Sequence, residues 1–285
     1  MKEIKYFFVA AMLFLVASCK QPVTIQSPPG YDLSKPEVFK MPAVLNEISG
    51  IAFKNGNADT LYAVQDEKGE LFHQDSGDDR ILSTKFGKNG DYEDLSIWKD
   101  NAVVLRSDGT FFTFPLTYSD KKTGLNVSEF KDLVPAGEYE SMYADEKNNT
   151  VYVLCKDCSG NKKDKIVNGY TLKIDTAGQL ATDAEFSISE EEIEKLSGIK
   201  KIRLKAAAMA KNSLTGEWYI VSAVNNLLLI TDANWKVKNT YPLLPASVFT
   251  QPEGIAFDSK GNLYIANEGG GIGGATVLKF AYQSK

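Results

Sequence analysis

Acidic residues recur at the same place in several similar segments of this sequence. Glu93, Glu140 and Glu253 each open a segment in which a small or acidic residue precedes an apolar and aromatic run, and Ser49 and Ala207 hold this position in two further segments. Carboxylate oxygens are the ligands that a hard cation such as Ca2+ prefers, and Ca2+ takes about 6–8 of them. If the fold brings the three glutamates together, they predict a metal site for Ca2+.

A second layer of polar residues stands two positions before the first. Side chains two residues apart in an extended strand lie on the same face. This layer consists of Glu47, Asp91, Glu138, Lys205 and Gln251. Its three acids and the three glutamates of the first layer would crowd one surface, and an isolated buried carboxylate is costly. The acids therefore require a bound cation, an ion pair with Lys205, or a water-filled mouth that leaves them solvated.

Five segments of one template position these residues. Each contains a short strand, a turn and a second strand with an apolar and aromatic core, and a further strand-like run follows. Successive segments start 44, 47, 67 and 46 residues apart, and a period near 45 with several short strands is typical of β-propeller blades. The sequence therefore predicts an all-β fold, a five-bladed β-propeller that occupies residues 31–285 as a single domain.

The chain between the segments predicts how the ring is completed. Residues 37–43 (EVFKMPA) would supply the missing strand of the last blade, so that no sheet edge stays open. The interval of 67 residues contains Ser189 followed by three glutamates, a capping box that predicts one short inserted helix near residues 190–197. A six-bladed ring is the alternative, with a degenerate blade between residues 161 and 205.

The channel mouth is the predicted binding surface. The first strand of each blade lines the channel of a propeller, and the second strand runs antiparallel to it, so the ends of the second strands reach the same rim. Among the cations there, Arg106 and Lys156 would fix an anionic ligand. The predicted ligand-binding residues of the mouth are Glu47, Asp66, Asp91, Arg106, Glu138, Lys205, Asn267 and Glu268.

Other kinds of chemistry find little support in the composition. The single histidine, His73, lies in an outer strand-like run, which argues against a Ser-His-Asp enzyme and against His-rich metal sites. A net charge of -5 and a pI near 5.2 argue against nucleic acid as a partner. Cys155 and Cys158 follow a predicted strand, which favours a structural disulfide in a turn over a redox centre.

The N-terminal residues predict where the protein is located. Two lysines precede twelve apolar residues, which suits the core of a secretory signal and is too short to span a bilayer as a helix. The segment VASC resembles a bacterial lipobox, so residues 1–18 would be a lipoprotein signal peptide and Cys19 the lipidated residue. Residues 19–30, with three prolines, would form a tether. The chain is thus expected in the bacterial cell envelope, held to the membrane by its lipid anchor and facing the periplasm or the surface.

Three motifs carry a family resemblance. LNEISGIAF, GDYEDLSIW and above all QPEGIAFDSKGNLYIANEGG resemble the SdiA-regulated (YjiK-like) family of bacterial β-propeller lipoproteins, over residues 31–282. The part GIAFDSKGNLYIAN also suits propellers of the NHL and gluconolactonase types. The resemblance implies an exported or membrane-attached propeller, and it supplies no catalytic residues.

The leading interpretation is a non-enzymatic propeller that binds a small molecule or an envelope protein at its acid-lined mouth, with Ca2+ as the candidate ion. The competing hypothesis is a metal-dependent hydrolase of a lactone or phosphate ester. There, Glu93, Glu140 and Glu253 would hold Ca2+, and Glu47 or Asp66 would activate water. A third possibility is a purely architectural ring of acids, with binding on the outer loops.

Overall fold

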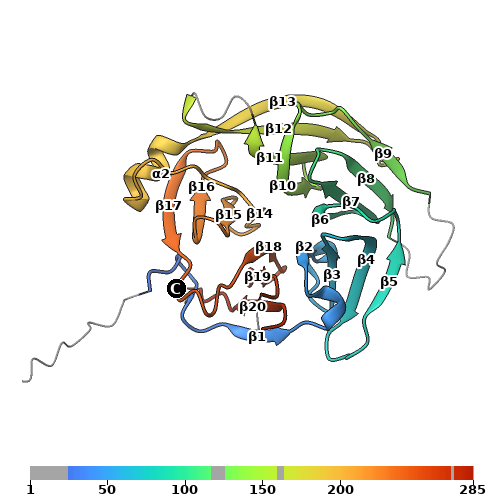
Figure 1. Ribbon diagram of the computed structural model, residues 1–285, viewed down its shortest axis with the longest axis horizontal. Helices are drawn as coiled ribbons and strands as arrows, with labels where there is room; N and C mark the ends of the chain where they lie inside the picture. The colour runs from blue at the N-terminus through green and yellow to red at the C-terminus, as the bar shows by residue number, and fades with distance from the viewer. Residues whose placement is uncertain (1–24, 117–125, 159–163, 271–272, 285) are drawn as a thin grey trace, which may run out of the picture.

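Five four-stranded antiparallel sheets surround a central axis (Figure 1). The computed structural model describes residues 25–116, 126–158, 164–270 and 273–284. In every sheet one edge strand lies next to the axis and its neighbours follow outward. The five-bladed β-propeller is thereby confirmed. The predicted signal peptide, Cys19 and the start of the tether lie outside the described residues.

The first four blades use consecutive strands, from the axis outward. Blade 1 contains β2 (Ile48–Ala52), β3 (Thr60–Gln65), β4 (Lys68–Asp75) and β5 (Leu82–Lys85). Blade 2 contains β6 (Tyr92–Trp98), β7 (Asn101–Arg106), β8 (Phe111–Pro115) and β9 (Ser128–Phe130). Blade 3 contains β10 (Gly137–Asp145), β11 (Thr150–Cys158), β12 (Ile166–Ile174) and β13 (Leu180–Ser189). Blade 4 contains β14 (Ala208–Lys211), β15 (Trp218–Ser222), β16 (Leu227–Thr231) and β17 (Val237–Pro242).

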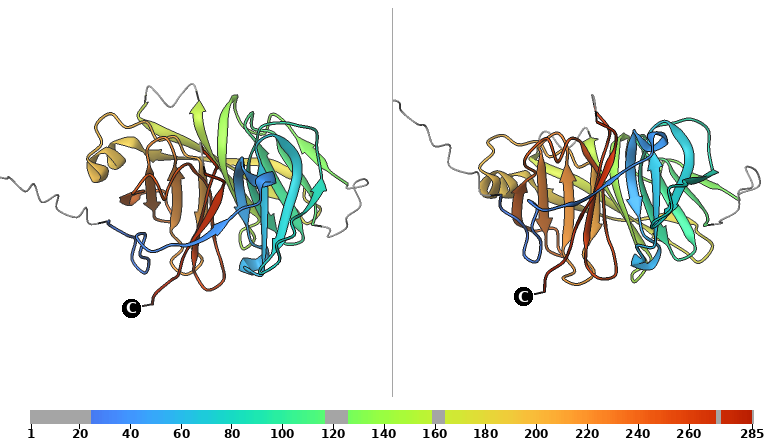
Figure 2. Two further views of the ribbon diagram at one scale, coloured as in Figure 1. Left: turned by 60° about the horizontal axis from the view of Figure 1, so that its bottom comes forward. Right: turned by 90° about the horizontal axis from the view of Figure 1, so that it is seen from below.

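The last blade closes the ring with a strand from the other end of the chain. It contains β18 (Pro252–Phe257), β19 (Leu263–Asn267), β20 (Thr276–Phe280) and, outermost, β1 (Glu37–Lys40). β1 pairs antiparallel with β20, with Glu37 opposite Lys279, and an ion pair of 2.9 Å joins these two side chains. The predicted closure by residues 37–43 is confirmed, and in Figure 2 β1 runs along the outside of the ring.

Short helices lie between some of the strands. In α2 (Glu190–Ser197), the Ser189 side chain accepts a hydrogen bond from the Glu192 backbone N–H, and Gly198 ends the helix in the left-handed conformation at φ 74°. The predicted inserted helix is thus present. Strands β12 and β13 belong to blade 3, so the region considered for a sixth blade holds no separate sheet among its described residues. Two short 3-10 turns, Ala43–Leu45 and Lys54–Gly56, flank β2.

Neighbouring blades touch through their innermost strands. Asp94 Oδ2 accepts a hydrogen bond of 2.6 Å from the Met142 N–H of the next blade, and Ser96 Oγ accepts one of 2.9 Å from the Ala144 N–H. Gly50 stands where β6 has Asp94, and there the backbones approach closely. A Cβ atom at Gly50 would lie 2.4 Å from the Leu95 nitrogen and 2.7 Å from the Asp94 Cα. Only glycine fits this contact between blades 1 and 2.

We expect Gly50→Ala to reduce the free energy of unfolding by roughly 1–3 kcal/mol, because overpacking a rigid backbone contact forces the blades apart. Urea denaturation followed by tryptophan fluorescence measures the change. Gly270→Ala is the matched control, since a Cβ atom there meets nothing within 4 Å. Equal unfolding midpoints for the two variants would contradict this account of the blade contact.

Candidate functional site

Three β-bulges aim glutamates into one end of the channel. The pairing of β6 with β7 shifts register between Tyr92 and Asp94, that of β10 with β11 around Glu140, and that of β18 with β19 between Pro252 and Gly254. These shifts leave Glu93, Glu140 and Glu253 as extra residues, and a second shift between β10 and β11 leaves Lys156 as an extra residue of β11. A bulge re-aims the side chain it carries. In blade 4, β14 pairs with β15 without such a shift.

The three glutamates interact with one another. Burial raises the pKa of Glu93 to about 9, and the charges of Glu140, Asp91 and Glu253 add to this effect. Burial and the charge of Glu140 raise the pKa of Glu253 to about 7. The sequence-predicted column is therefore one cluster of mutually repelling carboxyl groups, in which Glu93 is mostly protonated at neutral pH.

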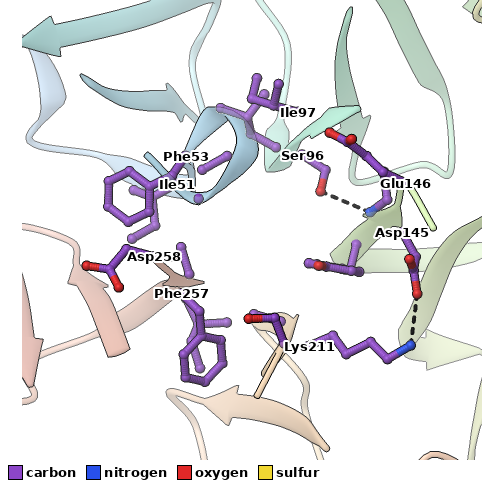
Figure 3. A pocket seen from close by; sticks show the side chains of 18 of the residues that line it. Ile51, Phe53, Ser96, Ile97, Asp145, Glu146, Lys211, Phe257 and Asp258 are labelled. Atoms are coloured by element: carbon purple, nitrogen blue, oxygen red, sulfur yellow. Dashed lines mark hydrogen bonds and ion pairs between the residues drawn. The ribbon is translucent and has the colours of Figure 1, made fainter. Parts of the chain in front are cut away.

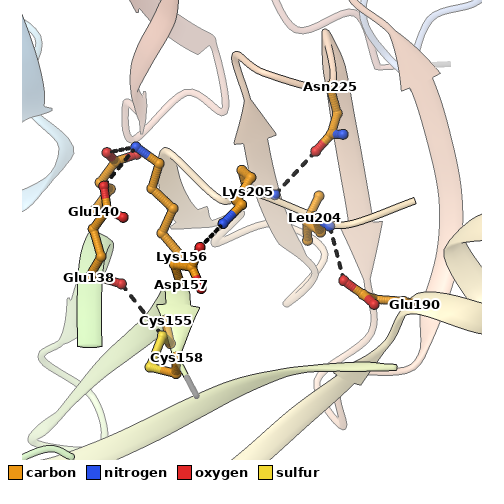
Figure 4. A network of polar contacts seen from close by, with 10 residues as sticks. All are labelled: Glu138, Glu140, Cys155, Lys156, Asp157, Cys158, Glu190, Leu204, Lys205 and Asn225. Atoms are coloured by element: carbon orange, nitrogen blue, oxygen red, sulfur yellow. Dashed lines mark hydrogen bonds and ion pairs between the residues drawn. A yellow bond between two sulfur atoms is a disulfide. The ribbon is translucent and has the colours of Figure 1, made fainter. Parts of the chain in front are cut away.

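Lys156 supplies the positive charge of this cluster (Figure 4). It extends from β11, and its Nζ donates a hydrogen bond to Glu140 and lies 3.3 Å from Glu138 Oε1. Burial raises the pKa of the Glu140 carboxyl, and Lys156 opposes that rise. Burial lowers the pKa of Lys156, but its bonds to Glu140 and Glu138 outweigh this and raise it overall. Lys156 and Glu140 thus each favour the charged form of the other in this ion pair.

The other lysine of the mouth has a different partner. Lys205 Nζ lies 2.6 Å from Asp157 Oδ2, at the rim. The sequence offered Lys205 as the partner of the channel acids, and it gave Lys156 the role of binding an anion. In the structure, the ammonium that reaches a channel glutamate is that of Lys156. Two neighbouring residues near the end of β11, Lys156 and Asp157, therefore organise both lysine pairs.

A disulfide encloses these two residues at the end of β11. Cys155 and Cys158 are bonded to each other at the end of β11, and both are buried. The link confines Lys156 and Asp157 between two fixed points (Figure 4). Gly137 on the neighbouring strand makes room for it, because a Cβ atom there would lie 2.4 Å from the Cys158 sulfur. The disulfide therefore supports the side chains that carry the charges of the mouth.

A second group of acids lies beside the first. Burial raises the pKa of Glu268, and a hydrogen bond with Glu47 raises it further. Gln251 donates a hydrogen bond to Glu268. Burial also raises the pKa of Asp66, followed by the charges of Glu47, Glu67 and Asp91. One oxygen of Asp66, Oδ1, is buried without a hydrogen-bond partner among the described residues.

Two predicted mouth residues point elsewhere. Arg106 binds Asp108 at 2.8 Å, lies 4.0 Å from Glu129 on the outermost strand and covers the ring of Phe112. It holds a hairpin on the outer side of its blade. Asn267 is fully buried and donates hydrogen bonds to the Val248 carbonyl, in the segment before β18, and to the Thr276 hydroxyl of the neighbouring strand β20. We define the acidic mouth by the remaining residues, which are Glu47, Asp66, Asp91, Glu93, Glu138, Glu140, Lys156, Lys205, Glu253 and Glu268.

An apolar ring separates the acidic mouth from the other end of the channel. It lies two residues beyond the glutamates along the inner strands, and its side chains are buried. The ring consists of Ile51, Leu95, Met142, Met209 and Ile255. On its far side lies a pocket of about 380 Å³ (Figure 3). Sequence reasoning missed this pocket, because the residues at its inner end have the apolar types expected of a core.

The described residues contain no group of three or more His, Cys, Asp or Glu side chains arranged to hold a metal ion. At the predicted metal residues Glu93, Glu140 and Glu253, the ammonium of Lys156 is already bonded to Glu140. A cation added there would compete with Lys156. Within the same residues, no helix has the length and apolar character needed to cross a membrane.

No family model and no curated protein matches the sequence. Solved structures do match. A glutaminyl cyclase from Myxococcus xanthus superposes with a TM-score of 0.55 at 14% identity, over 87% of this chain and 98% of that one. The β-propeller domain of Cps50 (Swd1) from Myceliophteria thermophila superposes with a TM-score of 0.51 at 10% identity, over 87% and 100%. At such low identities the likeness concerns the fold alone, and this chain is a β-propeller.

Proposed function

We propose that this protein is a binding propeller of the bacterial cell envelope, and that its acidic mouth holds the cationic group of a small ligand. The observation that carries the proposal is the pairing of Lys156 with Glu140 and Glu138. It shows how the mouth accommodates an ammonium group. Glu93 and Glu253 stand beside this pair with raised pKa values, so the mouth holds more acid than Lys156 neutralises.

A ligand cation would relieve this imbalance. A carboxyl group whose pKa is raised by neighbouring negative charges ionises more readily when an opposite charge approaches within about 4–6 Å. Binding of an amine should therefore release protons from Glu93 and Glu253. The proposed location in the cell envelope rests on the predicted signal peptide, on the predicted lipidation of Cys19 and on the resemblance to the SdiA-regulated family.

Ca2+ is the competing occupant. Carboxylate oxygens are its preferred ligands, and the raised pKa values of Glu93 and Glu253 are also what an acid–base catalyst requires. In the hydrolase hypothesis, Glu93, Glu140 and Glu253 would hold the ion and Glu47 or Asp66 would serve as the base. Both hypotheses use the same glutamates, and they differ in the cation that binds.

Calorimetric titration of the purified protein at pH 8 with spermidine and, separately, with CaCl2 distinguishes them. We expect saturable spermidine binding that weakens at least tenfold in the double variant Glu93→Gln/Glu253→Gln. Glu185→Gln, which changes an exposed residue of β13, is the matched control and should bind as the unmodified protein does. Calcium binding without spermidine binding would favour the hydrolase hypothesis. Heat from neither cation would make the acids a solvated channel lining.

A further inference from the structure

The pocket at the opposite end of the channel has two chemically different sides. Its inner end is the apolar ring, which separates it from the acidic mouth. Blades 1 and 2 contribute mainly apolar side chains. Blade 5 contributes Phe257 and also Asp258, and blades 3 and 4 contribute the charged side chains of Asp145, Glu146, Lys147 and Lys211. In Figure 3 the side chains of Phe53 and Phe257 extend toward the neighbouring blades at the edge of the pocket, and Lys211 extends toward Asp145. Its volume of about 380 Å³ lies within the range of small-molecule sites, about 300–1,000 Å³.

The apolar side is held in place from behind. The ring of Phe53 meets that of Tyr264 edge-on at 4.6 Å, and the ring of Phe257 meets that of Tyr219 edge-on at 5.0 Å. Tyr219 is buried. Because both phenylalanines are braced in this way, little side-chain entropy is lost when a ligand packs against them. This side is therefore suited to an aromatic ring or a compact apolar group.

Lys211 is the donor of the charged side whose position is fixed by an ion pair. Asp145 is buried, and its oxygens accept hydrogen bonds from the Lys147 N–H at 2.9 Å and from Asn148 Nδ2 at 3.1 Å. Lys211 Nζ lies 2.8 Å from Asp145 Oδ2 and 5.3 Å from the ring centre of Trp218. An ammonium has three N–H groups, and Asp145 takes one of them. The Lys211 side chain, 23% exposed, is thus fixed with donors available to the pocket.

We propose that this pocket is a second binding site, for a small apolar carboxylate whose ring packs against the apolar lining that includes Phe53 and Phe257 and whose carboxylate accepts hydrogen bonds from Lys211. A carboxylate suits the site better than an amine, because the carboxylates of the lining already accept hydrogen bonds within the protein. Asp145 accepts them from Lys147, Asn148 and Lys211, Asp258 from its own turn and Tyr264, and Glu146 from the Lys99 N–H. Hydrogen bonds between an ammonium and a carboxylate are about twice as strong as neutral ones. This site is independent of the proposed function of the acidic mouth, which lies beyond the apolar ring.

The probe is 1-naphthoate, titrated into the purified protein by calorimetry and by tryptophan fluorescence, since Trp218 lies beside Lys211. We expect saturable binding with a dissociation constant below about 1 mM. Lys211→Gln keeps a donor for Asp145 but removes the charge, and it should weaken binding at least tenfold. Phe257→Leu removes part of the apolar wall and should weaken binding several-fold. Neutral 2-naphthol should bind the unmodified protein less tightly than 1-naphthoate.

Two controls make the test decisive. Glu93→Gln lies in the acidic mouth and should leave naphthoate binding unchanged. The melting temperature of each variant shows whether it remains folded, and Phe257→Leu tests the site even if Lys211→Gln unfolds. The proposal is overturned if 1-naphthoate does not bind at millimolar concentration, if folded Lys211→Gln and Phe257→Leu bind as tightly as the unmodified protein, or if Glu93→Gln abolishes binding.

Discussion

Glutamine in place of Glu93 is expected to stabilise the protein at pH 8 and to have much less effect at pH 4.5. The folded protein holds this carboxyl at a pKa of about 9, against an ordinary value of 4.5. Between these two values the unfolded chain ionises Glu93 while the folded protein keeps it protonated. The contribution of Glu93 to stability is therefore complete below pH 4.5 and is lost as the pH rises toward 9.

The glutamine side chain does not titrate, so the stability of the variant does not fall through this cause between pH 4.5 and 9. One pKa unit corresponds to about 1.4 kcal/mol, but Glu93 is only half-buried and solvent screens part of the effect. We therefore expect the free energy of unfolding to increase by roughly 1–3 kcal/mol at pH 8. Each kcal/mol raises the melting temperature by about 2–4 °C in a chain of 150–250 residues and by somewhat less in a longer one. Calorimetric melting between pH 4.5 and 9 measures the difference from the unmodified protein.

Glu185→Gln is the control for this series, because Glu185 is exposed on β13, far out in blade 3. Its melting temperature should follow that of the unmodified protein at every pH. A constant offset between Glu93→Gln and the unmodified protein from pH 4.5 to 9 would mean that Glu93 keeps an ordinary pKa. The glutamates would then be solvated rather than crowded.

The sequence predicted the blades, the closing strand and the inserted helix because each follows from a local signal or from the repeat. The blade period, the strand that closes the ring and the cap at Ser189 each depend on neighbours within a few residues or on a repeat that is visible in the chain. The column of Glu93, Glu140 and Glu253 could be predicted for the same reason, since equivalent positions of repeated units meet at the axis.

The partners of that column could not be predicted. Whether Lys156 or Lys205 reaches the glutamates depends on two irregularities in the pairing of β10 with β11, which leave Lys156 and Glu140 as extra residues on facing strands. An extra residue of this kind changes the direction in which a side chain points. The residue types in the sequence do not reveal where it occurs. Arg106 illustrates the same limit, because a bond to Asp108 two residues away directs it outward.

The far pocket escaped prediction for a different reason. The side chains of its inner end have the types and spacing of ordinary core residues, and they are buried. Only the three-dimensional structure shows that space remains beyond them. Lys211 was a weak sequence signal of this pocket. It is the charged residue at the inner-strand position that Phe53, Ile97 and Phe257 occupy in other blades.

Removing the ammonium of Lys156 should convert its own place into a binding site. In Lys156→Met, the apolar stem is kept and Glu140 loses its cation. Burial would then raise the pKa of Glu140 without opposition. Breaking a buried ion pair costs about 3–5 kcal/mol. Since Glu138 is half exposed and Glu140 can take up a proton, we expect a loss of roughly 1–3 kcal/mol at pH 8.

The vacated position should accept an amine from solution. We expect spermidine to bind Lys156→Met about tenfold more tightly than the unmodified protein at pH 8, and to restore part of the lost melting temperature. Lys205→Met is the matched control, because it removes a lysine whose pair with Asp157 lies at the rim. It should lose less stability and gain little affinity.

Equal spermidine affinities for the two lysine variants would contradict the assignment of Lys156 as the internal occupant of the mouth. A loss of spermidine binding in Lys156→Met alone would point instead to a scaffolding role, in which the lysine holds Glu140 in place for the ligand. The sign of the change in affinity therefore decides whether Lys156 competes with the ligand or prepares its site. That sign does not depend on the stability of the variant, provided both proteins remain folded during the titration.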